Sequence, residues 1–97
     1  MTYEVAWHER VRSDLRALAR EDISRILERV NHHLVENPAG YGKPLKGVFK
    51  GLYRYRVGSY RIIYAIDHPE RRVLILHVRH RKDAYKILRE DERPYSP

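Results

Sequence analysis

The chain has 97 residues, enough for one small domain with a single hydrophobic core. Its 20 Lys and Arg residues against 13 Asp and Glu residues give a formal net charge of +7, which favours a polyanionic partner, with nucleic acid first among the candidates. The absence of cysteine excludes disulfides, thiolate nucleophiles and the usual structural zinc sites. Neither a membrane span nor a secretion signal is visible, so we expect a single cytoplasmic domain over residues 1–97 with no membrane partner.

The N-terminal part of the chain predicts a strand and then two helices. Tyr3, Val5 and Trp7 alternate with their neighbours, as in a half-buried strand. Apolar residues at helical spacing then predict a helix over residues 9–19. A second helix follows, with Asp22 as its candidate cap, and an Asn-Pro pair at residues 37–38 ends it. We expect the two helices to form a hairpin.

The rest of the chain predicts a loop and three strands. Residues 37–51 contain most of the Gly and Pro, which is typical of a loop, and this loop also carries lysines. A hairpin over residues 52–64 and a strand over residues 72–79 come next. Asp83 is a candidate cap for a short terminal helix. The predicted order of elements is therefore β-α-α-β-β-β-α.

The predicted hairpin concentrates arginines on one side. Its residues alternate strictly around Gly58-Ser59, which predicts a tight connection of type II′. In this register Arg56 faces Arg61, and Arg54 lies on the same side as Arg56. Like charges facing each other across a strand pair are destabilising, so the pattern favours an anionic ligand such as phosphate. A merely solvated basic surface is the alternative.

Alternation assigns the strand residues to two faces of a sheet. The predicted core face carries Tyr53, Tyr55, Val57, Tyr60, Ile62, Tyr64 and Ile66, together with Leu74, Leu76 and Val78. The opposite face carries the hairpin arginines and, on the last strand, Val73, Ile75, His77, Arg79 and Arg81. We therefore expect the basic residues to converge on one open face, with the helices on the other.

Arginine chemistry suits a phosphate with extra negative charge, because the guanidinium group combines a permanent charge with a forked set of donors. Arginine rarely gives up a proton, so the nearby candidates for acid or base work are His77, His80 and Tyr85. His77 and His80 point to opposite faces of a continuing strand, and His32 and His33 diverge on a helix, so we expect no metal site and no cofactor. The sequence also lacks a convincing nucleophilic triad and a Walker-type phosphate loop.

The order of elements and two clusters together resemble the RelE branch of the RelE/ParE toxin superfamily. The clusters are residues 51–64 and the run His77-Val-Arg-His-Arg-Lys-Asp-Ala-Tyr85, and the likeness extends from Tyr3 to about Tyr85. The resemblance implies an α+β fold in which an N-terminal two-helix hairpin packs on one face of a small antiparallel sheet. It also implies a type II toxin that a cognate antitoxin neutralises, with endoribonuclease activity as an mRNA interferase. Such a toxin cleaves messenger RNA in the ribosomal A site, without metal, by attack of a ribose 2′-hydroxyl on the adjacent phosphate.

The resemblance assigns roles to individual residues. Arg54 and Arg56 resemble the family's basic pair on the first hairpin strand, and Arg61 matches its phosphate-stabilising arginine. Arg81 would stabilise the phosphate or the leaving oxygen, and Tyr85 would stack on or orient the nucleotide. The expected catalytic residues are Arg56, Arg61, Arg81 and Tyr85, and the expected RNA contacts are Lys46, Lys50, Arg54, Arg79, His80 and Lys82. Some members have lysines at the places of Arg54 and Arg56, which leaves His80 and Tyr85 as candidate proton acceptors here.

Two other functions are compatible with these features. A ParE-like toxin would bind and inhibit DNA gyrase and cleave nothing. Members of that branch generally lack the joint arginine and tyrosine arrangement, so the combination of Arg61, Arg81 and Tyr85 favours the nuclease. A basic RNA-binding module without catalysis would use the same arginines only as contacts to the nucleic-acid backbone.

Overall fold

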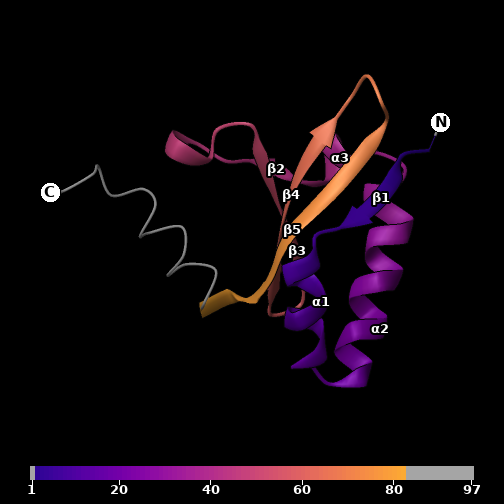
Figure 1. Cartoon of the computed structure of the whole chain (residues 1–97), viewed down its shortest axis with the longest axis vertical. Coiled ribbons are helices and arrows are strands. Elements are labelled where there is room, and N and C mark those ends of the chain that lie inside the picture. The colour runs from indigo at the N-terminus through magenta and orange to yellow at the C-terminus, as the bar shows by residue number, and fades with distance from the viewer. Residues whose placement is uncertain (1, 83–97) are drawn as a thin grey trace, which may run out of the picture.

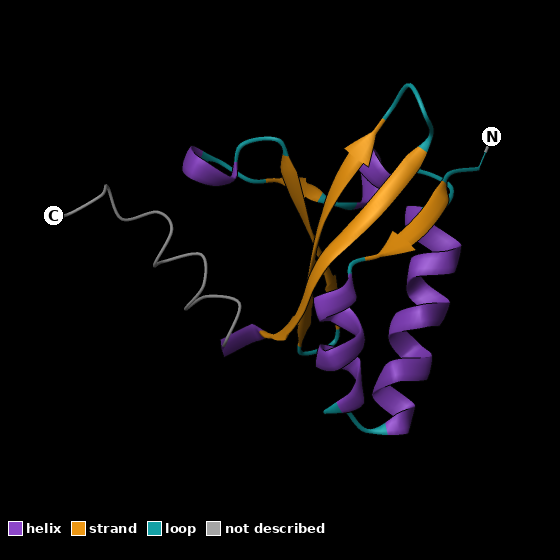
Figure 2. Cartoon of the chain, viewed as in Figure 1, coloured by secondary structure: helices purple, strands orange, loops and turns teal. Residues whose placement is uncertain are grey.

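A computed structural model describes residues 2–82 of the chain. These residues form a five-stranded sheet with the N-terminal helices on one side (Figure 1; Figure 2). In chain order the elements are β1 (Glu4–Trp7), α1 (Glu9–Arg16), α2 (Arg20–Arg29), the π-helical turn η1 (Val30–Leu34), α3 (Pro38–Tyr41), β2 (Lys43–Pro44), the 3₁₀ turn η2 (Gly47–Phe49), β3 (Leu52–Val57), β4 (Tyr60–Asp67) and β5 (Arg72–His80). The predicted helix beginning at Asp83 lies outside the described residues.

The sheet has the strand order β1-β5-β4-β3-β2 and is mostly antiparallel. The predicted α+β class, with the helical hairpin on one face, is confirmed. Two features differ from the prediction. First, β1 runs parallel to β5, which is possible because the helices and the other strands lie between them in the chain. Second, Lys43–Pro44 forms the short edge strand β2 inside the predicted loop, at an edge position where proline is tolerated.

The helices begin and end close to the predicted places, with one correction. α2 begins at Arg20 after the extended residue Ala19, so Asp22 lies in its first turn and does not cap it. The Asp22 carboxylate instead accepts a hydrogen bond from the Tyr60 hydroxyl at 3.1 Å, which ties α2 to β4. An acidic residue in a first turn still interacts favourably with the helix dipole. Asn37 then caps α3, its side chain accepting from the Gly40 backbone N–H at 3.1 Å.

The hairpin of β3 and β4 has the predicted register. Gly58 has a φ of +58°, whereas Ser59 is not among the residues with positive φ, which fits a type II′ turn and excludes type I′. Arg56 is paired with Arg61, and Tyr55 is paired with Ile62. Both members of the second pair are buried, so the prediction that they lie together in the core is confirmed.

The assignment of β5 residues to the two faces was partly wrong, because a bulge interrupts the alternation. A register shift in the middle of the β4–β5 pair leaves Leu76 outside the ladder. Before the bulge, Val73 and Ile75 are fully buried in the core, whereas Leu74 is 37% exposed. After it, Val78 lies in the core as predicted. The prediction assumed strict alternation along the strand, which does not allow for an extra residue. It therefore assigned the apolar residues of β5 before the bulge to the wrong faces of the sheet.

One hydrophobic core forms between the helices and the sheet. Its buried residues are Val11, Ile26, Val30, Leu34, Tyr55, Val57, Ile62, Tyr64, Val73, Ile75 and Val78. They come from α1, α2, η1 and the three longest strands. The alternate residues of those strands face the other side, where the arginines lie.

Candidate functional site

Three arginines form a row across the sheet, on the face turned away from α2. Arg56 of β3 is paired with Arg61 of β4, which is paired in turn with Arg79 of β5. Directly paired residues on neighbouring strands project to the same face and lie about 5 Å apart at their Cβ atoms. We call Arg56, Arg61 and Arg79 the arginine row. Such a row concentrates positive charge and is well suited to hold an anion.

The members of the arginine row differ in exposure and contacts. Arg56 is exposed, and its Nε donates to the Gly58 carbonyl at 3.2 Å. Arg61, in the middle, is only 9% exposed, and its Nη1 lies 3.5 Å from the carbonyl oxygen of Tyr60. Burial restricts the motion of a charged group and makes its charge act through a lower dielectric. Arg61 is therefore the most deeply buried cation of the row.

Arg79 is held by a carboxylate that the sequence analysis did not consider. Its Nη1 forms a hydrogen-bonded ion pair with Asp14 Oδ1 from α1. The Asp14 side chain is almost fully buried, and that of Arg79 is about one-third exposed. No sequence signal links positions 14 and 79. The link arises because β1 pairs with the first half of β5, so that α1 then packs against β5.

A second line of residues adjoins the arginine row on the same face. Arg54 is paired with Ile63, which is paired with His77. His77 is half-buried, and burial lowers its pKa, with further lowering by the positive charges of Arg10 and Arg79. Its Nδ1 is buried and has no hydrogen-bond partner in the described part of the chain. A histidine in these surroundings is neutral near pH 7.

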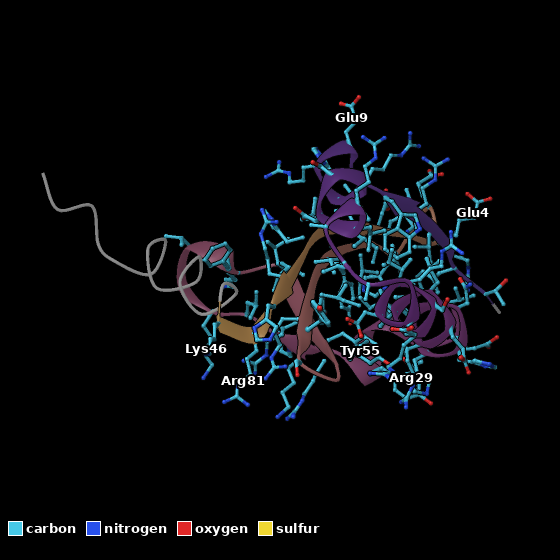
Figure 3. All side chains as sticks on the ribbon, turned by 90° about the horizontal axis from the view of Figure 1, so that it is seen from below. Glu4, Glu9, Arg29, Lys46, Tyr55 and Arg81 are labelled. Carbon is cyan, nitrogen blue, oxygen red and sulfur yellow. The ribbon has the colours of Figure 1, made fainter. Side chains whose placement is uncertain are left out.

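Arg81 and Lys82 are exposed and follow directly after β5. The Arg81 backbone N–H donates to the Ser59 carbonyl at 2.7 Å, which fixes the end of β5 beside the hairpin turn. Figure 3 shows the Arg81 side chain at the lower left of the view, with Tyr55 and Arg29 further right along the same edge. The pairing in the hairpin confirms the common face of Arg54, Arg56 and Arg61, and Arg81 follows the last residue of β5. The expectation that both helices leave this face open is wrong for α1, because its Asp14 binds Arg79 there. Tyr85 lies outside the described residues.

The other predicted RNA contacts do not join the arginine row. His80 is paired with Tyr60 on the opposite face, and the two rings meet edge to face with centroids 5.7 Å apart. Lys46 and Lys50 are exposed on either side of η2, which lies at the other end of the sheet from the last residues of β5 (Figure 1). Within residues 2–82, no three His, Asp or Glu side chains gather as a metal site would require.

Comparisons with known proteins establish the family. The family described as ParE toxin of type II toxin-antitoxin system, parDE, matches residues 5–85. This chain belongs to the RelE/ParE superfamily of type II toxins. Toxin RelE of Mycobacterium tuberculosis is 36% identical to it over 85 residues, which cover 88% of both chains. Toxin RelG of the same organism is 35% identical over 86 residues, covering 89% of this chain and 99% of RelG.

Solved structures confirm the RelE-like fold of the toxin. The toxin–antitoxin complex RelBE2 from M. tuberculosis contains a chain with a TM-score of 0.80 and 33% identity, covering 84% of this chain and 100% of that chain. The RelE–RelB complex of Pyrococcus horikoshii OT3 gives a TM-score of 0.66 at 30% identity, covering 84% and 97%. Among residues 2–82 of the toxin, no helix is long and apolar enough to cross a bilayer.

Proposed function

We propose that this toxin is a ribosome-dependent endoribonuclease that cleaves messenger RNA in the A site and needs no metal. Its partners in the cytoplasm would be the ribosome with its bound message and a cognate antitoxin, by analogy with the RelBE2 and RelE–RelB complexes of its relatives. The arginine row carries the proposal, because it supplies cations on one face of the sheet with the buried Arg61 at its centre.

The proposed reaction begins with attack of the ribose 2′-oxygen on the adjacent phosphorus. Negative charge then builds up on the phosphate oxygens, and Arg61 and Arg56 would stabilise it through fixed guanidinium donors. Arg81, at the end of β5, would act on the phosphate or the departing 5′-oxygen, and Tyr85 would orient the nucleotide. Arg54, Arg79, His80, Lys82, Lys46 and Lys50 complete the proposed set of RNA contacts.

Primer extension on a message bound to ribosomes tests this function. We expect Arg61→Ala and Arg81→Ala to slow cleavage by about 10²–10³, the usual loss when a donor to a transition-state oxyanion is removed. Ribosome binding should change far less, because several other cations remain. Arg20→Ala, at an exposed position on α2, is the matched control and should cleave like the parent. Cleavage by Arg81→Ala at the parent rate would contradict the assignment, and an inactive parent would refute the nuclease itself.

Inhibition of DNA gyrase is the second candidate, since the matching family description over residues 5–85 is that of ParE toxins. A supercoiling assay with purified gyrase distinguishes the two. The nuclease proposal predicts unchanged supercoiling at toxin concentrations that cut ribosome-bound message. If the toxin stops supercoiling and leaves the message uncut, gyrase inhibition is its function and the nuclease proposal is wrong.

A further inference from the structure

Two buried polar atoms lack hydrogen-bond partners in the described part of the chain, and both belong to the contact between α1 and β5. They are Oδ2 of Asp14 and Nδ1 of His77. Buried polar groups are nearly always paired, so each such atom calls for an explanation. One is an acceptor, and the other donates in one tautomer of the imidazole.

The two side chains belong to one cluster. Asp14 already uses Oδ1 to bind Arg79, and Arg79 lies two residues after His77 on the same face of β5. Residues at that spacing are neighbours along a strand, at a distance of about 7 Å. The Asp14 charge acts directly on His77, whose protonation it favours.

We propose that His77 is the proton acceptor of the cleavage reaction and that Asp14 is its positioning residue. This inference rests on the proposed nuclease function. Donation from His77 Nδ1–H to Asp14 Oδ2 fixes the tautomer in which Nε2 carries the free lone pair. Through its other oxygen, Asp14 holds Arg79 of the arginine row. One carboxylate thus orients both the base and a phosphate-binding cation.

His77 suits this role better than the arginines or His80, the other histidine that the sequence places near them. Arginine does not give up its proton at physiological pH. His80 lies on the opposite face beside Tyr60, whereas His77 shares the face of Arg61.

The charges around His77 keep it ready to accept a proton. Arg10 and His8, from α1 and its N-cap, lower its pKa, as does Arg79 on its own strand, whereas Asp14 raises it. Burial is the largest effect and the net direction is downward from 6.5, so the imidazole is neutral when the substrate arrives.

The proposed step balances as follows. The 2′-oxygen forms a bond to phosphorus while its proton passes to His77 Nε2. The bond from phosphorus to the 5′-oxygen breaks, and that oxygen takes a proton from water. The products are a 2′,3′-cyclic phosphate and a 5′-hydroxyl, and the imidazolium then returns its proton to solvent.

Single-turnover cleavage of ribosome-bound message, measured from about pH 5 to pH 9, tests the assignment. The parent rate should rise with pH to a plateau, with a midpoint below 6.5 because neutral His77 is the active form. His77→Gln should cleave about 10²–10⁴-fold more slowly than the parent, and its rate should no longer rise with pH. His32→Gln, at an exposed histidine of η1, is the matched control and should keep both the rate and the profile. A His77→Gln variant that cleaves within about threefold of the parent with the same pH profile overturns the proposal but leaves the nuclease function standing.

Asp14→Asn supplies a test that does not depend on cleavage. Loss of the carboxylate charge should lower the titration midpoint of the His77 ring in NMR spectra, because Asp14 favours its protonated form. The acid side of the rate profile should shift in the same direction, while ribosome Kd stays close to that of the parent. Glu9→Gln, at an exposed carboxylate on the same helix, should leave the His77 midpoint unchanged. An unshifted midpoint in Asp14→Asn refutes the pair, even if the parent toxin makes no cuts.

Discussion

At the scale of single residues, Tyr64 and Gly42 show how closely the connection between α3 and β2 packs against β4. The Tyr64 hydroxyl donates to the Pro38 carbonyl at 2.6 Å, and burial raises the pKa of this phenol far above its ordinary value. A Cβ atom at Gly42 would lie well inside van der Waals contact with that hydroxyl. The backbone of Gly42 has a φ of −92°, so space alone requires glycine here.

We expect Gly42→Ala to lower the free energy of unfolding by about 1–3 kcal/mol through steric overlap. Tyr64→Phe should lower it by about 1–3 kcal/mol, because the Pro38 carbonyl loses its donor. Phenylalanine at position 64 also removes the hydroxyl oxygen with which the methyl group of Ala at position 42 would overlap. The double variant should therefore lose less stability than the sum of the single variants, as urea denaturation can measure. Strict additivity would contradict the close approach.

At the scale of elements, the hairpin of β3 and β4 sets the register of the arginine row through one turn residue. Gly58 adopts a φ of +58°, a conformation that costs an L-residue about 1–2 kcal/mol. A Cβ atom there would lie 3.6 Å from Arg25 Nη1, which is an ordinary contact. The cost of a side chain at this position is therefore a backbone cost.

Gly58→Ala should accordingly destabilise the toxin by about 1–2 kcal/mol in denaturant unfolding. Ser59→Ala, at the neighbouring turn position without positive φ, is the control and should remain within about 0.5 kcal/mol of the parent. Equal stability of the two variants would show that the turn adopts another conformation in solution.

The same elements show what could be predicted from the sequence. The hairpin could be predicted because alternation and a Gly-Ser loop are local signals, and the pairing of Arg56 with Arg61 follows from them. The faces taken by the β5 residues before Leu76 could not be predicted, because a bulge depends on how β4 and β5 pair in the folded sheet. The edge strand β2 was missed because two residues, one of them proline, carry no strand pattern.

The candidate site divides in a similar way. The common face of Arg54, Arg56 and Arg61 was predicted from the hairpin alone. The burial of Arg61 and the ion pair between Asp14 and Arg79 could not be predicted, because they depend on contacts between segments that are distant in the sequence. His80 was expected on the RNA side, although it follows Arg79 by one residue and must point to the other face while the strand continues.

At the scale of the whole molecule, the positive charge falls into regions with different proposed tasks. The arginine row lies near the hairpin turn, whereas Lys46 and Lys50 lie at the other end of the sheet, as Figure 1 shows for η2. A ribosome presents phosphates over an area much larger than this toxin. Cations far from the row can therefore add binding energy without touching the reacting phosphate.

Lys46→Ala and Lys50→Ala should each weaken ribosome binding and reduce its salt dependence by about one unit of slope for a lost phosphate contact. The cleavage rate at saturating ribosome should stay at the parent value, because neither lysine reaches the arginine row. Arg61→Ala should show the converse, with a slow chemical step and a nearly unchanged salt slope. Arg16→Ala, exposed on α1, is the control for net charge alone and should alter the slope less than either lysine variant. If Arg16→Ala and Lys46→Ala change the slope equally, net charge and not the η2 surface governs binding.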